Sequence, residues 1–151
     1  MSKIDTLHPL IREDVRSLVN KINTDVLKGN VKMVVTQGLR TFAEQDALFA
    51  QKPKVTNAKG GQSIHNYGLA FDFCLVDGGR TIWDTVKDFD GDKVPDWMEV
   101  VKAFKAAGFA WGGDFRSIVD KPHFEKTFGH TWQQLLAIKQ SGKTENGYVV
   151  I

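Results

Sequence analysis

The sequence predicts a single α+β domain in which helices flank a small, mainly antiparallel sheet. Its 151 residues are close to the usual length of one domain, and no internal repeat or linker divides them. Its composition, 42% hydrophobic and 25% charged, is that of a globular protein with a core. Short apolar or β-branched runs alternate with segments of helical periodicity, which indicates both kinds of element in one domain.

The N-terminal third is predicted to form a helix, a strand and a second helix. Residues 8–28 repeat apolar side chains at helical spacing and are followed by Gly29, which ends the helix. Residues 31–38 (VKMVVTQG) are short, β-branched and closed by glycine, as in a strand. Residues 41–51 begin with TFAE, which has the spacing of a capping box, so they are expected to be helical.

The remaining residues are predicted to alternate loops, short strands and two more helices. The expected elements are a loop (52–63), a buried strand (68–76), a short strand (80–83), an acidic loop (84–96), a helix (96–108), a strand–turn–strand (109–126) and a last helix (131–140). We expect Asp96 to be the N-cap of its helix and Gly108 to end that helix.

Composition argues against several classes of function. The net charge is only +2 and no run of Lys and Arg stands out, so nucleic-acid binding is not expected. No apolar run has the length of a signal peptide or a transmembrane helix, so neither export by a signal nor membrane insertion is expected. The one cysteine, Cys74, lies in an apolar run and is expected to be a free core residue. We expect the protein to be a monomer.

Two histidines and an aspartate are candidates for a metal site. Catalytic zinc typically takes three protein ligands and leaves one position for water, and His65, Asp72 and His123 would provide such a set. His65 and Asp72 are seven residues apart, so on one straight strand they would point to opposite faces. A bend at residues 66–68 is therefore required. The pattern alone leaves open a buried aspartate held by backbone amides or by an arginine, and a hydrogen-bonded strand histidine.

Several sequence blocks resemble a known family of enzymes. SIHNYGLAFD fits the pattern S-x-H-x-x-G-x-A-x-D, and DKPHFE fits D-x-P-H-F. With QGLRTFAEQDALFAQ, TNAKGGQS and WGGDF, they resemble the L-alanyl-D-glutamate peptidases of phage endolysins and bacterial wall hydrolases. Those enzymes are zinc peptidases, in a group that also includes D-Ala-D-Ala carboxypeptidases and dipeptidases. The blocks cover residues 31–125 in the family order, and the resemblance implies the LAS-type, Hedgehog-like fold with zinc at the sheet.

The resemblance also implies roles for individual residues. The zinc ligands would be His65, Asp72 and His123. Asp120 would be the general base, and Arg40 would stabilise the oxyanion. Ser63 and Gln37 would support the site or the substrate. Glu125 lies two residues after the last histidine, so we expect it to orient that ligand without binding the metal itself.

The implied function is a zinc-dependent endopeptidase that cleaves the L-Ala–D-Glu bond of peptidoglycan stem peptides. A phage endolysin is expected, made in the host cytoplasm without a signal peptide and released to the cell wall through a holin. One alternative is a D-Ala-D-Ala carboxypeptidase or dipeptidase on the same scaffold, against which the aspartate base and the TNAKGGQS block argue. The other is a wall-binding zinc module without turnover, which would normally close its metal site with a fourth protein ligand.

The acidic loop gives a second metal hypothesis. Acidic residues fall at positions 1, 3, 5, 9 and 12 of a stretch, the ligand spacing of an EF-hand calcium loop: Asp88, Asp90, Asp92, Asp96 and Glu99. The stretch departs from the EF-hand rule at position 6, where Lys93 stands in place of glycine. This departure favours the alternative, a solvated acidic turn whose Asp96 caps the next helix.

Overall fold

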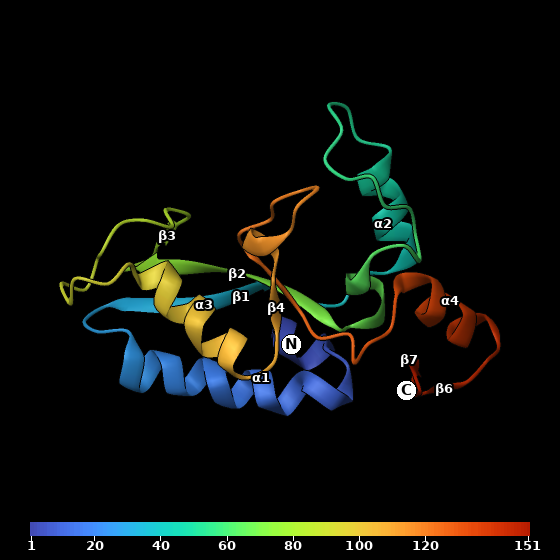
Figure 1. The fold of residues 1–151 in the computed structure, drawn as a ribbon, viewed down its shortest axis with the longest axis horizontal. Helices are drawn as coiled ribbons and strands as arrows, with labels where there is room; N and C mark the ends of the chain where they lie inside the picture. Colours follow the sequence, from blue (N-terminus) through green and yellow to red (C-terminus); the bar gives the residue numbers. More distant parts are fainter.

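A five-stranded antiparallel sheet forms the centre of the computed structural model, which describes residues 1–151 (Figure 1). Its strands are β1 (Val31–Gln37), β2 (Ala70–Asp77), β3 (Arg80–Ile82), β4 (Ala110–Trp111) and β5 (His123–Glu125). Their order is β1-β2-β5-β4, and β3 pairs with β2 beyond the end of β5. The predicted α+β fold with a small antiparallel sheet is therefore confirmed.

Four α-helices surround this sheet, and each was predicted to within a few residues. They are α1 (Pro9–Lys21), which continues into a π-helical turn η2 (Ile22–Val26), α2 (Phe42–Phe49), α3 (Asp96–Ala106) and α4 (Trp132–Gln140). Three 3₁₀ turns complete the helical elements, η1 (Lys3–Thr6), η3 (Ile64–Tyr67) and η4 (Gly112–Asp114). None of the helices is long and apolar enough to span a bilayer.

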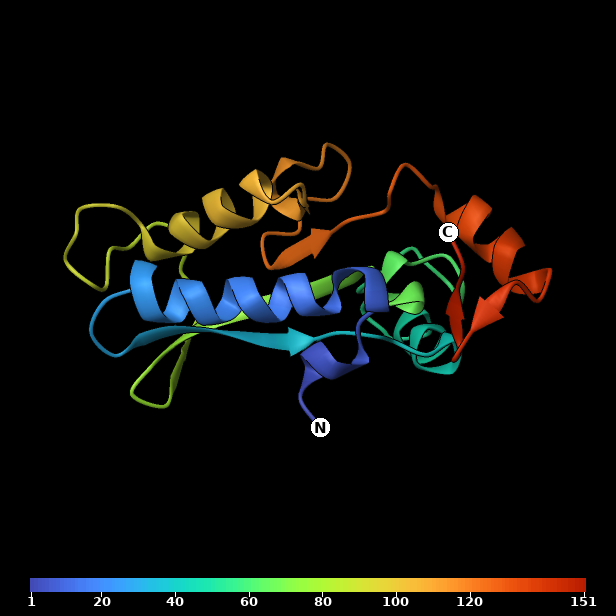
Figure 2. The same ribbon diagram turned by 90° about the horizontal axis from the view of Figure 1, so that it is seen from below.

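The two faces of the sheet have different roles because side chains alternate along each strand. On one face, Phe71 and Phe73 of β2 contact α3, with ring centroids 5.1 Å from Phe104 and 4.3 Å from Trp97. Buried side chains of α1 belong to the same core, and Figure 2 shows α1 running along β1 with α3 beside it. The opposite face carries Asp72. In Figure 1, α2 and the segment between β4 and β5 rise on this side of the sheet, away from α1.

The N-terminus of α3 differs from the prediction. Pro95 is the N-cap, and Asp96 is the first helical residue. The Asp96 carboxylate turns back into the preceding loop, where Oδ2 accepts a hydrogen bond from the Phe89 amide at 2.9 Å. Asp96 is 0% exposed, so it is a buried loop carboxylate rather than a solvated cap.

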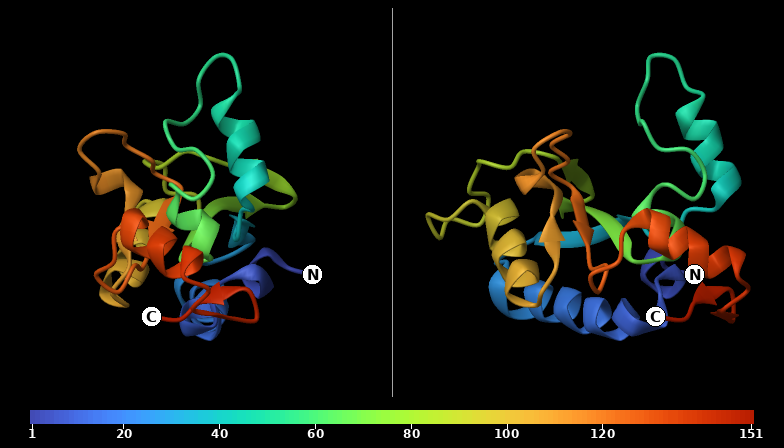
Figure 3. Two further views of the ribbon diagram at one scale, coloured as in Figure 1. Left: turned by 90° about the vertical axis from the view of Figure 1, so that its right-hand side faces the viewer. Right: turned by 45° about the vertical axis from the view of Figure 1, so that its right-hand side comes forward.

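A C-terminal hairpin was not predicted. Its strands β6 (Thr144–Glu145) and β7 (Tyr148–Val149) are joined by Asn146 and Gly147, both with positive φ. The Asn-Gly pair is a strong hairpin signal, but the strands are too short to show alternation. The hairpin lies beside the start of α1, as the right-hand view of Figure 3 shows. There the His8 ring contacts the Val149 carbonyl at 2.8 Å.

Candidate active site

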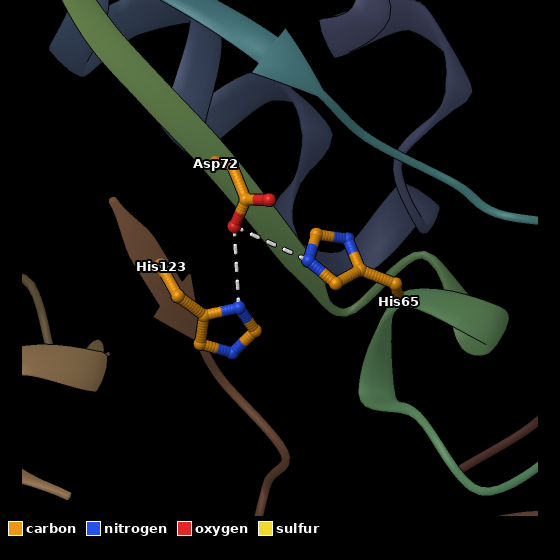
Figure 4. Close-up of side chains that lie close together, drawn as sticks. All are labelled: His65, Asp72 and His123. Atoms are coloured by element: carbon orange, nitrogen blue, oxygen red, sulfur yellow. Dashed lines mark hydrogen bonds and ion pairs between the residues drawn. The ribbon is translucent and has the colours of Figure 1, made fainter. Parts of the chain in front are cut away.

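His65, Asp72 and His123 converge on one point at the sheet face opposite the core (Figure 4). Asp72 and His123 are directly opposite each other in the pairing of β2 with β5. Asp72 Oδ1 lies 3.3 Å from His123 Nδ1 and 3.3 Å from His65 Nε2. Candidate ligand atoms of all three residues lie within 4.8 Å of one another. The structure thus brings together the three residues that the sequence singled out.

The required bend between His65 and Asp72 is present. His65 lies in η3, where the Ser63 hydroxyl accepts a hydrogen bond from the His65 amide at 3.2 Å. Gly68 ends η3 with φ +69°, a left-handed conformation that glycine adopts without strain. A Cβ at Gly68 would also lie 2.7 Å from the backbone nitrogen of His8. The chain therefore turns at glycine and enters β2 with Asp72 facing the His65 ring.

The outer nitrogens of both histidines have acceptor partners. His65 Nδ1 lies 2.9 Å from the Gly38 carbonyl, and His123 Nε2 lies 2.7 Å from Glu125 Oε1. When these nitrogens carry the protons, the inner nitrogens present lone pairs to the Asp72 carboxylate. Three acceptor atoms then face one another, an arrangement that a cation between them stabilises. Glu125 supports His123 as expected; the role of the Gly38 carbonyl has no signal in the sequence.

The residues present fit a zinc ion. A tetrahedral zinc with ligand bonds of ~2.0–2.1 Å separates its ligand atoms by about 3.3 Å. The two distances from Asp72 Oδ1 to the histidine nitrogens have this value. The hydrogen bonds to Gly38 and Glu125 would fix both ring orientations, as outer-shell partners do at zinc sites.

The carboxylates give the site a negative electrostatic potential. Burial favours the neutral form of Asp72, yet hydrogen bonds from His123 and His65 hold the pKa of this carboxyl well below its usual range. Burial opposes protonation of His123, but the Asp72 and Glu125 carboxylates raise its pKa to about 9. Two carboxylates therefore hold positive charge, a proton or a metal ion, at this point.

Asp120 lies beside this cluster without belonging to it. Its Oδ2 is 3.9 Å from His123 Nδ1, and its side chain is 48% exposed. Burial and the Asp72 charge raise the pKa of Asp120 above its ordinary value, while both histidines and Arg40 oppose this effect. Its backbone is held against Gly112, whose carbonyl accepts the Asp120 amide at 2.9 Å. A Cβ at Gly112 would collide with the Asp120 carbonyl, so the WGGD block permits this close approach.

Arg40 and Gln37 lie between the cluster and α2. Gln37 pairs with Asp72 across β1 and β2, next to an irregularity in the register. Both residues line a shallow cavity of about 260 Å³ beside α2. Burial lowers the pKa of Arg40, against the opposing charges of Asp72, Glu44 and Asp120.

Gln45 positions Arg40, a role that sequence reasoning missed. Gln45 is fully buried, and its Oε1 accepts a hydrogen bond from the Arg40 guanidinium at 2.9 Å. Its Nε2 donates to the Ala58 carbonyl at 2.8 Å. The only hint in the sequence is that a glutamine occupies the buried side of α2.

The acidic residues form a separate cluster. One carboxylate oxygen each from Asp88, Asp90, Asp92 and Asp96 lies within 4.8 Å of the others. Their loop joins β3 to α3, at the opposite end of the molecule from α2 (Figure 1).

Comparison with known proteins assigns the chain to a family. A family model described as D-alanyl-D-alanine carboxypeptidase, within the M15 peptidases, matches residues 56–126. The peptidoglycan L-alanyl-D-glutamate endopeptidase CwlK of Bacillus subtilis is 42% identical over 130 residues, which are 79% of this chain and 72% of the relative. The chain belongs to the L-alanyl-D-glutamate peptidase family. The resemblance of its sequence motifs is thereby confirmed.

Two more relatives extend this picture of the L-alanyl-D-glutamate peptidase family. The L-alanyl-D-glutamate peptidase of Listeria phage A118 is 30% identical over 98 residues, which are 63% of this chain but only 30% of the phage enzyme. The crystal structure of the L-Ala D-Glu endopeptidase ChiX of Serratia marcescens superposes with a TM-score of 0.60 at 23% identity, covering 83% of this chain and 84% of that one. The second comparison shows a shared fold.

Proposed function

We propose that this protein is a zinc-dependent peptidoglycan endopeptidase that cleaves the L-Ala–D-Glu bond of stem peptides. The observation that carries the proposal is the His65–Asp72–His123 cluster, whose ligand atoms converge without a fourth His, Cys, Asp or Glu among them. A structural zinc site closes with four protein ligands, whereas a catalytic site keeps one position open. When bound, zinc would lower the pKa of a water in the open position and polarise the scissile carbonyl.

Asp120 is proposed to move the proton. Its carboxylate is close to the cluster but outside it, so it can reach a water that lies beside the ligands. It would take a proton from the attacking water and pass it to the leaving amine. The half-exposed position allows Asp120 to contact solvent and substrate in turn.

Arg40 is proposed to stabilise the oxyanion. The Gln45 hydrogen bond holds one end of the guanidinium, and the cavity beside α2 leaves the side chain accessible. A fixed positive charge next to the scissile carbonyl stabilises the negative charge that develops there. Gln37 and Ser63 have supporting roles in this proposal, Gln37 beside Asp72 and Ser63 as the cap that positions His65.

The names of the relatives support the bond specificity. CwlK and the phage enzyme both bear the name of an L-alanyl-D-glutamate peptidase, and CwlK matches most of this chain. The description of the family model favours a second candidate, a D-Ala-D-Ala carboxypeptidase. That model covers only residues 56–126. We propose that endopeptidases and carboxypeptidases of this kind share this segment.

Digestion of purified peptidoglycan tests these candidates. Mass spectrometry of the products should show stem peptides that begin with D-Glu, together with L-Ala left on the glycan. Release of free D-alanine would instead establish the carboxypeptidase. Tight binding to the wall with no new amino termini, by protein shown to contain one zinc per chain, would establish a non-catalytic module.

We further propose that the enzyme acts as a monomeric phage endolysin on the host wall, a role supported by the Listeria phage relative. Expression in a susceptible host should cause lysis only when a holin is expressed with it. Lysis without a holin would contradict this route of release.

A further inference from the structure

We propose that the loop formed by residues 88–99 binds one calcium ion, at a site separate from the His–Asp–His cluster. Asp88, Asp90, Asp92 and Asp96 would be ligands, as would Glu99. The binding of calcium is independent of the proposed peptidase activity, and only the link to residues 120–123, argued last, rests on that activity. Residues 88–99 are called the calcium loop below.

The decisive observation is a buried oxygen without a partner. Asp96 is 0% exposed, and its Oδ1 has no hydrogen-bond donor, although Oδ2 accepts from the Phe89 amide. Asp96 offers an oxygen to the group formed with Asp88, Asp90 and Asp92. The buried Oε1 of Glu99 also has no hydrogen-bond partner. Burying a carboxylate oxygen without a partner is costly, and a cation at the centre of the loop would provide that partner.

The loop also lacks compensating protein charge. No lysine or arginine forms a salt bridge with any of the five acidic residues. Burial and the neighbouring carboxylates raise the pKa of Asp96 to about 6 and that of Glu99 to about 8. Part of this rise comes from the charges of the neighbouring aspartates, so the carboxylates repel one another, whereas hydrogen bonds lower the pKa of Asp88 and Asp92. A divalent cation with oxygen ligands removes this repulsion, and calcium accepts six to eight such ligands.

The backbone at Lys93 forms a left-handed turn although the residue is not glycine. Lys93 stands at position 6, where EF-hand loops have glycine, and it adopts φ +72°. Its amide donates to Asp88 Oδ2 at 2.6 Å, so the loop closes around position 1. Lys93 thus adopts the left-handed backbone conformation that glycine takes most easily. The left-handed lysine costs about 1–2 kcal/mol relative to glycine, and the loop retains it.

The calcium loop is connected to the catalytic segment. Trp97, directly after Asp96, donates from Nε1 to the Lys121 carbonyl at 3.2 Å, and Lys121 lies between Asp120 and His123 in the chain. The Trp97 ring also packs against Phe73 of β2, with the ring planes tilted by 36°. An ion that holds Asp96 at the start of α3 would thus also hold Trp97 against the segment that carries the catalytic aspartate.

Calorimetry on the zinc-loaded, calcium-depleted full chain tests the site. Calcium chloride should bind with one ion per chain and a dissociation constant between about 10⁻⁷ and 10⁻³ M, the range of sensor and extracellular loops. Saturating calcium should raise the Tm by about 5–10 °C. The Asp90→Asn variant should lose at least tenfold in affinity. The matched control is Asp84→Asn. Asp84 lies in the same connection between β3 and α3 but outside the cluster, and its carboxylate accepts hydrogen bonds from the Val86 and Lys87 amides. This variant should bind calcium like the parent.

A second variant separates a metal site from a merely acidic turn. Glu99→Gln should have a Tm in calcium-free buffer no lower than that of the parent, because glutamine has nearly the same shape and adds no charge. It should abolish most of the rise in Tm that calcium gives. Absence of binding up to 10 mM calcium (about tenfold beyond the weakest loops of this kind), or equal binding by the parent, Asp90→Asn and Glu99→Gln, would overturn the proposal. Wall digestion by the parent and by Asp84→Asn should increase on addition of calcium, and digestion by Asp90→Asn should not. Equal responses of all three would overturn the link through Trp97.

Discussion

Asp72 and His123 face each other across β2 and β5, with 3.3 Å between Asp72 Oδ1 and His123 Nδ1. Because backbone pairing fixes this approach, two of the three candidate ligands are positioned by the sheet itself. Only His65 depends on a turn outside the sheet. The site is therefore built mainly on paired strands of the central sheet.

Replacing His65, Asp72 or His123 by alanine should remove zinc and abolish wall digestion. Each replacement leaves two ligand atoms, which are too few for stable binding of catalytic zinc. Metal content of the purified variants, measured by mass spectrometry, checks this prediction. Alanine at His130, which lies outside the cluster, is the control and should keep one zinc per chain. A zinc-free parent protein with full activity would refute the metal assignment.

Asp120→Ala should retain zinc but lose turnover by about 10²–10⁴-fold, the usual contribution of a general acid–base group. Its carboxylate is outside the ligand cluster, so metal content should not change. The matched control is Asp114→Ala, an exposed carboxylate whose ion pair with Lys105 is on the surface. Equal activity of the Asp120 and Asp114 variants would rule out the assigned role.

Gln45→Ala should lower kcat by about tenfold or more with zinc content unchanged, because Arg40 loses its fixed orientation. Arg40→Ala should cost about 10²–10³-fold. Gln51→Ala, at an exposed position of the same cavity, serves as the control. If the double variant of Gln45 and Arg40 is no less active than Arg40→Ala alone, the two residues act as one unit. Independent, multiplying losses would contradict the positioning role.

The stability of the protein should depend on His8 at mildly acidic pH. Neutral His8 can accept from the Leu10 amide through Nδ1 and donate to the Val149 carbonyl through Nε2, so a second proton would break the first bond. Burial lowers the pKa of His8, and the Arg12 charge acts in the same direction. The unfolded chain therefore binds this proton at higher pH than the folded chain, and stability falls as pH drops through about 6.5.

His8→Asn tests this pH dependence, since asparagine can still cap α1 but does not titrate. The variant should be less stable than the parent at pH 7.5, and the gap in Tm should narrow toward pH 5. For the control His130→Asn, the difference in Tm from the parent should be the same at pH 7.5 and at pH 5. A constant difference between parent and His8→Asn at all pH values would contradict the prediction.

Local signals in the sequence predicted most of the fold. Capping boxes, glycines and short apolar runs located every helix and every strand of the main sheet, because these signals lie within or next to the elements they mark. The bend at Gly68 followed from the spacing of His65 and Asp72 once both had to reach one ion. The hairpin β6–β7 was missed because two-residue strands carry no alternation.

The parts of the site that were not predicted depend on contacts between distant segments. Gln45 meets Arg40 and Ala58 only after α2 has packed, and the Gly38 carbonyl reaches His65 from 27 residues away. The left-handed backbone of Lys93 could not be predicted for a related reason. The glycine rule describes an intrinsic backbone preference, whereas the Asp88 carboxylate binds the Lys93 amide and stabilises the left-handed turn.

The contact of His8 with Val149 joins residues 141 positions apart. During synthesis, α1 leaves the ribosome long before the carbonyl that its capping histidine will meet has been made. Tyr148, which donates to the Thr6 carbonyl over 142 positions, is in the same situation. The nascent chain can therefore form α1 early. The contacts of Tyr148 and Val149 with the start of α1 form only after nearly the entire domain has been translated.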